Sequence, residues 1–150
     1  MKLPETKVLL FIPLFSLLFF SCARPDYVND LNGKIDGVIG ECGLLFKSEN
    51  ICLSTKWNQR PSESEFGEMI LTFKDAKDPE RLVDPIANPT IILWMPSMGH
   101  GSSPVSIERV GLGTYRAFDI FFIMPGEWDI RYQLKNSNDV IEEKIQKITL

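Results

Sequence analysis

Apolar and polar positions alternate along much of this chain with the period of a β-strand. In residues 128–135 the two kinds alternate strictly, which is typical of a strand with one face in a core. Residues 51–57 and 69–73 show an apolar face with the same period. Residues 90–94 are apolar on both faces, which predicts a central position in a sheet.

Turn sequences separate these runs. Residues 110–114, which hold two glycines, predict a hairpin, and residues 136–139 predict the last tight turn. Pro125 and Gly126 stand in the order that the centre of a type II turn requires. Residues 78–89 contain three prolines, which predicts a long crossing loop rather than a helix.

The C-terminal segment, residues 140–150, fits two structures. Ile141, Ile145 and Ile148 match one face of a helix, whereas the β-branched content and the preceding turn favour a final strand. About seven short strands separated by turns predict an all-β fold, an immunoglobulin-like β-sandwich.

The first twenty residues differ in character from the rest. Residues 8–20 are apolar apart from one serine, and this run is too short for a helical span of the bilayer, which needs about 20 residues. It fits the apolar region of a signal peptide. The run ends in Phe19-Phe20-Ser21-Cys22, which resembles a bacterial lipobox, so we expect cleavage before a lipidated Cys22. An uncleaved membrane anchor and a leader in which Cys22 is incidental are the alternatives.

The chain is therefore expected to have three parts: a lipoprotein signal peptide (1–21), a lipidated tether (22–33) and a β-sandwich domain (34–150). The net charge of the full chain is −4, and loss of the signal peptide leaves 14 basic and 19 acidic residues, a charge of −5. No basic stripe occurs, which argues against nucleic acid as a partner. The expected membrane contact is the lipid on Cys22, in the bacterial envelope and facing the periplasm.

Two further cysteines, Cys42 and Cys52, flank two apolar runs around the polar tetrapeptide at residues 47–50. A hairpin there would bring the cysteines together in an oxidising environment, so we predict a disulfide that adds about 2–3 kcal/mol. A metal held by this pair is the alternative. The ten-residue spacing, with no histidine nearby, favours the disulfide.

The chain offers little for catalysis. His100 is the only histidine, and no G-x-S-x-G motif is present. The Gly-x-Gly at residues 111–113 lacks the third glycine and the helix of a nucleotide-binding motif. We therefore predict a protein that is not an enzyme.

The histidine lies in the stretch WMPSMGHGSSP, where Met95, Met98 and His100 are close in sequence. Copper(I) prefers thioether and imidazole ligands, and glycines on both sides of the histidine allow the loop to curl. Met124 is a fourth candidate ligand, because it also precedes a proline at a strand end. The alternative is that Met95 fills the core and that His100 only holds the loop in shape.

The segments MPSMGHGSSP and GTYRAFDIFFIMPGEWDIRYQL together resemble the FixH and YtkA-like family of exported or membrane-anchored domains. That family shares an M-P-x-M-x-H-G loop, then G-x-Y, an apolar strand, M-x-G-x-W and an alternating strand. The similarity covers about residues 66–150. It implies an immunoglobulin-like sandwich and a role in copper handling, in the better-known members around assembly of haem-copper oxidases.

The resemblance also implies a ligand set by position: Met95, Met98 and His100, with Met124 in addition. The chain departs from the oxidase-linked members in its expected lipid anchor and in its cysteine pair. These departures concern the oxidase role rather than the fold.

The expected function is that of a membrane-anchored envelope lipoprotein that binds copper(I) through a Met/His loop. It would handle copper or deliver it to a copper-receiving envelope protein. The alternative is an interaction module without metal, which uses the same loop as a rigid docking surface, with exposed sheet edges and Trp94 available to the partner.

Overall fold

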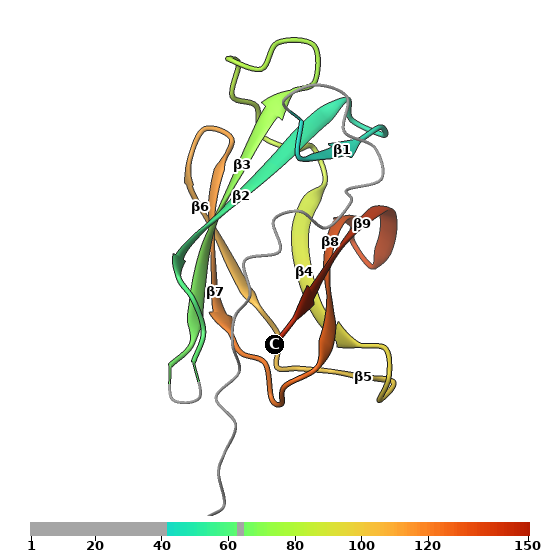
Figure 1. The fold of residues 1–150 in the computed structure, drawn as a ribbon. Coiled ribbons are helices and arrows are strands. Elements are labelled where there is room, and N and C mark those ends of the chain that lie inside the picture. Colours follow the sequence, from blue (N-terminus) through green and yellow to red (C-terminus); the bar gives the residue numbers. More distant parts are fainter. Residues whose placement is uncertain (1–41, 63–64) are drawn as a thin grey trace, which may run out of the picture.

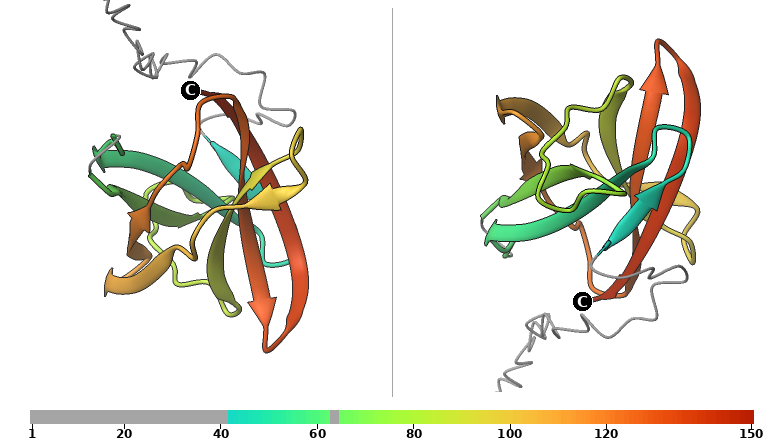
Figure 2. Two further views of the ribbon diagram at one scale, coloured as in Figure 1. Left: turned by 90° about the horizontal axis from the view of Figure 1, so that it is seen from below. Right: turned by 90° about the horizontal axis from the view of Figure 1, so that it is seen from above.

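The computed structural model describes residues 42–62 and 65–150 of the chain. This described part contains nine strands in two antiparallel sheets, which form two layers (Figures 1 and 2). The first sheet has the order β1-β2-β3-β7-β6 and the second the order β5-β4-β8-β9. The predicted all-β sandwich is therefore confirmed. The signal peptide, Cys22, the tether and residues 34–41 lie outside the described residues.

The strand bounds follow the predicted runs. They are β1 (Leu44–Phe46), β2 (Ile51–Gln59), β3 (Gly67–Asp75), β4 (Asn88–Met95), β5 (His100–Gly101), β6 (Ser106–Gly111), β7 (Thr114–Ile120), β8 (Glu127–Asn136) and β9 (Asp139–Thr149). Two of these, β1 and β5, have three and two residues, which is too short for an alternating pattern to be recognised. The ambiguous C-terminal segment is a strand.

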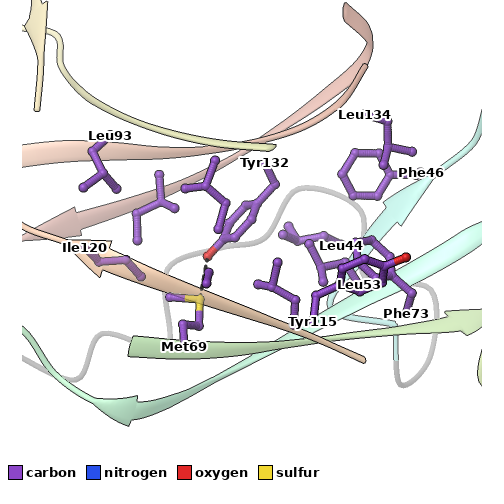
Figure 3. Close-up of a cluster of buried hydrophobic side chains, with 14 of the residues drawn as sticks. Leu44, Phe46, Leu53, Met69, Phe73, Leu93, Tyr115, Ile120, Tyr132 and Leu134 are labelled. Atoms are coloured by element: carbon purple, nitrogen blue, oxygen red, sulfur yellow. Dashed lines mark hydrogen bonds between the residues drawn. The ribbon is translucent and has the colours of Figure 1, made fainter. Parts of the chain in front are cut away.

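The apolar faces of the alternating runs meet between the two sheets. On β8 and β3 the inward-facing residues are at most 2% exposed: Trp128, Ile130, Tyr132, Leu134, Met69, Leu71 and Phe73. The Tyr132 hydroxyl crosses the core to the sulfur of Met69, at 3.6 Å (Figure 3), and also contacts Oε1 of Gln146 at 2.9 Å. Burial raises the pKa of Tyr132. Met69 is therefore a core residue.

Strand β4 lies between β5 and β8, so its predicted central position in a sheet is confirmed, but its two faces are not equally covered. Ile91, Leu93 and Met95 are at most 5% exposed, but Ile92 on the opposite face is 37% exposed. The short β5 pairs only with the last two residues of β4, so no other described strand pairs with the rest of that edge. On this outer face Ile92 is exposed, whereas Asp129 and Gln133 of β8 are buried, at 6% and 7% exposure.

The predicted hairpin around residues 47–50 is confirmed and carries the predicted disulfide. Cys42 and Cys52 are bonded, with their Cα atoms 5.3 Å apart. β1 and β2 pair from Leu44 opposite Leu53 to the turn, where Asn50 has a φ of +54°. The bond fixes the chain that enters β1 against β2.

The other turns agree with the sequence except for one. Residues 110–114 form the β6–β7 hairpin and residues 136–139 the β8–β9 hairpin. Gly126 has a φ of +139°, beyond the value of about +80° of a type II turn. It instead exchanges two backbone hydrogen bonds with Leu150, at 3.1 and 3.0 Å.

No helix in the described ranges is long and apolar enough to cross a membrane.

Carboxylates hold loops together at the end of the sandwich opposite the β4–β5 hairpin (Figure 1). Glu142 accepts hydrogen bonds from the backbone N–H groups of residues 47–48, at 3.1 and 2.8 Å. Glu49 does the same for residues 86–87, at 2.7 and 2.9 Å. Burial favours the protonated form of Glu142, but hydrogen bonds from Lys144 and from the two backbone groups prevail and lower its pKa to about 2.

Asp84 is the third of these carboxylates. It accepts hydrogen bonds from Nε and Nη2 of Arg109 at 3.0 and 2.8 Å, from the N–H of Gly113 at 2.9 Å and from the Tyr115 hydroxyl at 3.3 Å. The bonds from Arg109 and Gly113 lower its pKa to about 2. We call this end of the molecule, with Glu49, Asp84 and Glu142, the carboxylate end.

Candidate functional site

The predicted ligand loop lies at the opposite end of the sandwich. β4 ends at Met95, a turn follows over residues 96–99, and β5 returns beside β4. The connector from β7 to β8, residues 121–126, crosses the same end (Figure 1). Ser102 joins the two, because its N–H donates to the carbonyl of Leu93 at 3.1 Å and its hydroxyl donates to the carbonyl of Phe121. We call residues 95–101 and 121–126 together the rim.

The pairing of β4 with β5 places Met95 directly opposite His100. Residues that are paired in an antiparallel ladder project from the same face, with β-carbons about 4.5–5.5 Å apart. Met95 is 2% exposed and His100 is half-buried. The N–H groups of Met98 and Gly99 donate to the carbonyl of Met95, at 3.2 and 3.0 Å, and close the turn. A thioether and the only imidazole of the chain are therefore neighbours on one face.

Gly126, in the second Met-Pro corner, lies against Met95. A β-carbon on Gly126 would lie 2.8 Å from the Met95 methyl carbon, so a larger residue there would require the end of the Met95 side chain to shift. Met124, two residues earlier, is 37% exposed, and its carbonyl accepts a hydrogen bond from Nε1 of Trp128 at 3.0 Å. The corner is thus held on a buried tryptophan and contacts Met95.

The imidazole of His100 has one ring nitrogen near a backbone acceptor. Nδ1 lies 3.2 Å from the carbonyl oxygen of Gly101. A neutral ring that donates from Nδ1 keeps the lone pair on Nε2, which is the arrangement found in many histidine ligands of metals.

The four predicted ligand residues thus fall into two groups. Met95 and His100 share a face, and Gly126, two residues after Met124, lies against the Met95 methyl group. Met98 lies on the turn and is 58% exposed, the largest value of the four. The one sequence signal that pointed to Gly126 is its place in the M-x-G-x-W motif. The contact of Gly126 with Met95 was not predictable from sequence patterns, because it joins the connector between β7 and β8 to the end of β4.

Other metal-ligating side chains do not gather at the rim. Within residues 42–62 and 65–150, no group of three or more His, Cys, Asp or Glu residues could hold a metal ion. A metal bound at the rim would therefore depend on thioethers together with His100. That donor set suits copper(I) and does not suit zinc or magnesium.

No protein-family model, curated protein or solved structure matches this chain. The resemblance to the FixH and YtkA-like family rests on the two sequence segments and stays a prediction.

Proposed function

We propose that this protein is a lipid-anchored protein of the bacterial envelope that binds copper(I) at the rim and passes it on. The observation that carries the proposal is the β4–β5 pairing, which sets Met95 opposite His100, while Gly126 of the second Met-Pro corner lies against the Met95 methyl group. The spacing of Met95, Met98 and His100 in the sequence indicates only that these side chains can meet if the loop curls.

The chemistry of the rim agrees with this proposal. Thioethers and imidazole are soft or borderline ligands that select copper(I). The Cys42–Cys52 disulfide supports an oxidising compartment, in which free thiols are poor permanent ligands. Met98 and Met124 are exposed enough to meet a partner, which favours transfer of the metal over storage.

A copper(I) competition titration of the purified protein tests the proposal. Met95→Leu is the sharpest variant, because it removes the sulfur and nearly conserves the volume of a buried side chain. It and His100→Ala should each weaken binding about tenfold or more. Leu112→Ala, in the distant β6–β7 turn and as exposed as Met98, is the matched control and should bind normally. Micromolar or weaker affinity that these variants leave unchanged would refute copper binding.

The lipid anchor needs a separate test, because Cys22 is outside the described residues. We expect cells that express the protein to incorporate labelled palmitate into it, and Cys22→Ser to abolish the label. Incorporation that survives this substitution would contradict the assignment of Cys22.

A second candidate function is docking of another envelope protein on the rim. Met98, Ile123 and Met124 are 58%, 45% and 37% exposed, which leaves apolar side chains in solvent, whereas Met95 is nearly covered. Photo-crosslinking from position 98 in cells, with position 112 as control, tests this function. A specific adduct in copper-depleted cells together with failed titrations would favour docking, and no adduct at position 98 would argue against it.

A further inference from the structure

Strand β9 forms one edge of the second sheet. It has 11 residues, and among the described strands only β8 pairs with it. A long edge strand presents unpaired backbone groups that can template pairing with another chain.

The other edges are less suited to such pairing. β1 has three residues. β4 carries Pro89, which cannot donate a backbone hydrogen bond, and β5 covers its last two residues. On β6, Arg109 is engaged by Asp84 and Glu108 by Arg116. β1 and the β1–β2 turn lie against the start of β9, where Glu142 binds the backbone of residues 47–48. The structure therefore leaves the rest of β9 as the edge that a partner strand can reach.

The outward-facing side chains of β9 are self-complementary. Glu143, Ile145 and Lys147 lie opposite Gln133, Arg131 and Asp129 of β8, on the face turned away from the core. Ile145 is 46% exposed. Glu143 accepts a hydrogen bond at Oε2 from Nε2 of Gln133, and neither Glu143 nor Lys147 has an ion pair with another described residue.

We propose that two copies of this chain associate through β9, antiparallel, about a twofold axis at Ile145. Ile145 of each copy then meets Ile145 of the other, and Glu143 of each copy lies opposite Lys147 of the other, so that two opposite-charge pairs flank an apolar contact. The two four-stranded sheets become one continuous sheet. A C2 interface of this kind uses the same patch on both subunits.

The charge pattern selects this register. A continuous antiparallel sheet requires paired residues on the same face, so the axis must pass through a residue. An axis at Glu143 would oppose two glutamates, and one at Lys147 would oppose two lysines. An axis at Lys144 or Gln146, on the inner face, would place Ile145 opposite Glu143 or Lys147 and leave no opposite-charge pair on the outer face. This inference stands on the β9 edge alone and does not depend on copper binding at the rim.

The interface can be tested by introducing one additional cysteine at a time into the full-length protein and treating each variant with a short bis-maleimide crosslinker. Ile145→Cys should give a dimer well above the wild-type background, because the two sulfurs would be adjacent across the axis. Ile92→Cys is the matched control, since Ile92 is on the same outer face of the sheet but on β4, with 37% exposure. Equal dimer yields from the two variants would overturn the proposal.

Charge exchange then tests the register. Glu143→Lys and Lys147→Glu should each lower the Ile145→Cys dimer yield about tenfold, since each converts two attractive pairs into repulsive ones. The double variant restores opposite charges and should recover the yield. A double variant as weak as the single ones would overturn this register. Sedimentation velocity without crosslinker provides an independent measure, and a monomer at every accessible concentration would overturn the dimer.

Discussion

The two ends of the sandwich are built by different means. At the carboxylate end, Glu49, Asp84 and Glu142 accept hydrogen bonds from backbone N–H groups, and each joins segments far apart in the sequence. At the rim, the corresponding contacts use no charged group: they are backbone hydrogen bonds, hydrogen bonds from the Ser102 hydroxyl and the Trp128 indole to backbone carbonyls, and the packing of Met95 against Gly126.

This difference suggests that the carboxylate end serves the stability of the fold and that the rim serves binding. The charged groups at the carboxylate end are already occupied by the protein itself, so they hold the loops and have little left to offer a ligand. The rim keeps thioether and imidazole donors and exposed apolar side chains, and exposed apolar side chains cost little in stability. We therefore expect substitutions at the two ends to have separable effects, and the following changes test this from the largest expected effect to the smallest.

The largest effect is expected for Gly113→Ala at the carboxylate end. Gly113 has a φ of +60°, and an added β-carbon would lie 2.5 Å from the carbonyl oxygen of Phe73 and 2.9 Å from the backbone nitrogen of Val83. Because these atoms are backbone, they cannot move aside cheaply, and we expect a loss of about 4 kcal/mol in the free energy of unfolding. Gly111→Ala, in the same hairpin, meets only a 3.8 Å contact and is the control in urea unfolding. Similar losses in both variants would contradict this explanation.

Acid should next weaken the carboxylate end. The pKa values of Asp84 and Glu142 fall from 3.8 and 4.5 to about 2 on folding. A lowered pKa means that the native state is stabilised above the unfolded pKa, and that this contribution is lost as the pH falls from about 4.5 towards 2. Urea unfolding at a series of pH values should show this loss. Glu142→Gln should reduce proton uptake on unfolding by up to about one proton, whereas Met98→Ala should leave the pH profile unchanged.

At the rim, Gly126→Ala is expected to cost less stability but to alter the site. Its β-carbon would meet only the terminal methyl of Met95, which can shift, and its φ of +139° is strained for alanine. We expect a loss of about 2 kcal/mol, with a changed NMR shift of the Met95 methyl group and weaker copper(I) binding. An unchanged Met95 signal would show that Gly126 does not position this side chain.

The smallest effect on stability is expected for Met98→Ala. The side chain is 58% exposed, so its removal should change the free energy of unfolding by no more than about 0.5 kcal/mol. Copper(I) affinity should nevertheless fall. A stability loss as large as that of Gly126→Ala would mean that the rim, like the carboxylate end, serves mainly to hold the fold.

Much of the fold was predictable because strand formation depends on a local pattern. The apolar alternation in residues 69–73 and 128–135 predicted the inward faces of β3 and β8, and the cysteine spacing predicted the disulfide. The open face of β4 was not predictable. Whether Ile92 is covered depends on the length of β5 and on what lies over the sheet, and neither leaves a periodic signal.

For the candidate site, the sequence by itself determined which soft donors occur and that they flank turns: Met95, Met98, His100 and Met124. Only the tertiary structure decided that Met95 faces His100 and that Gly126 admits the Met95 methyl group, because strand register and the approach of two connectors depend on contacts between distant residues. The same holds for Glu49, Asp84 and Glu142. Their sequence neighbours are unremarkable, and the backbone groups that they bind are brought to them by the packing of the two sheets.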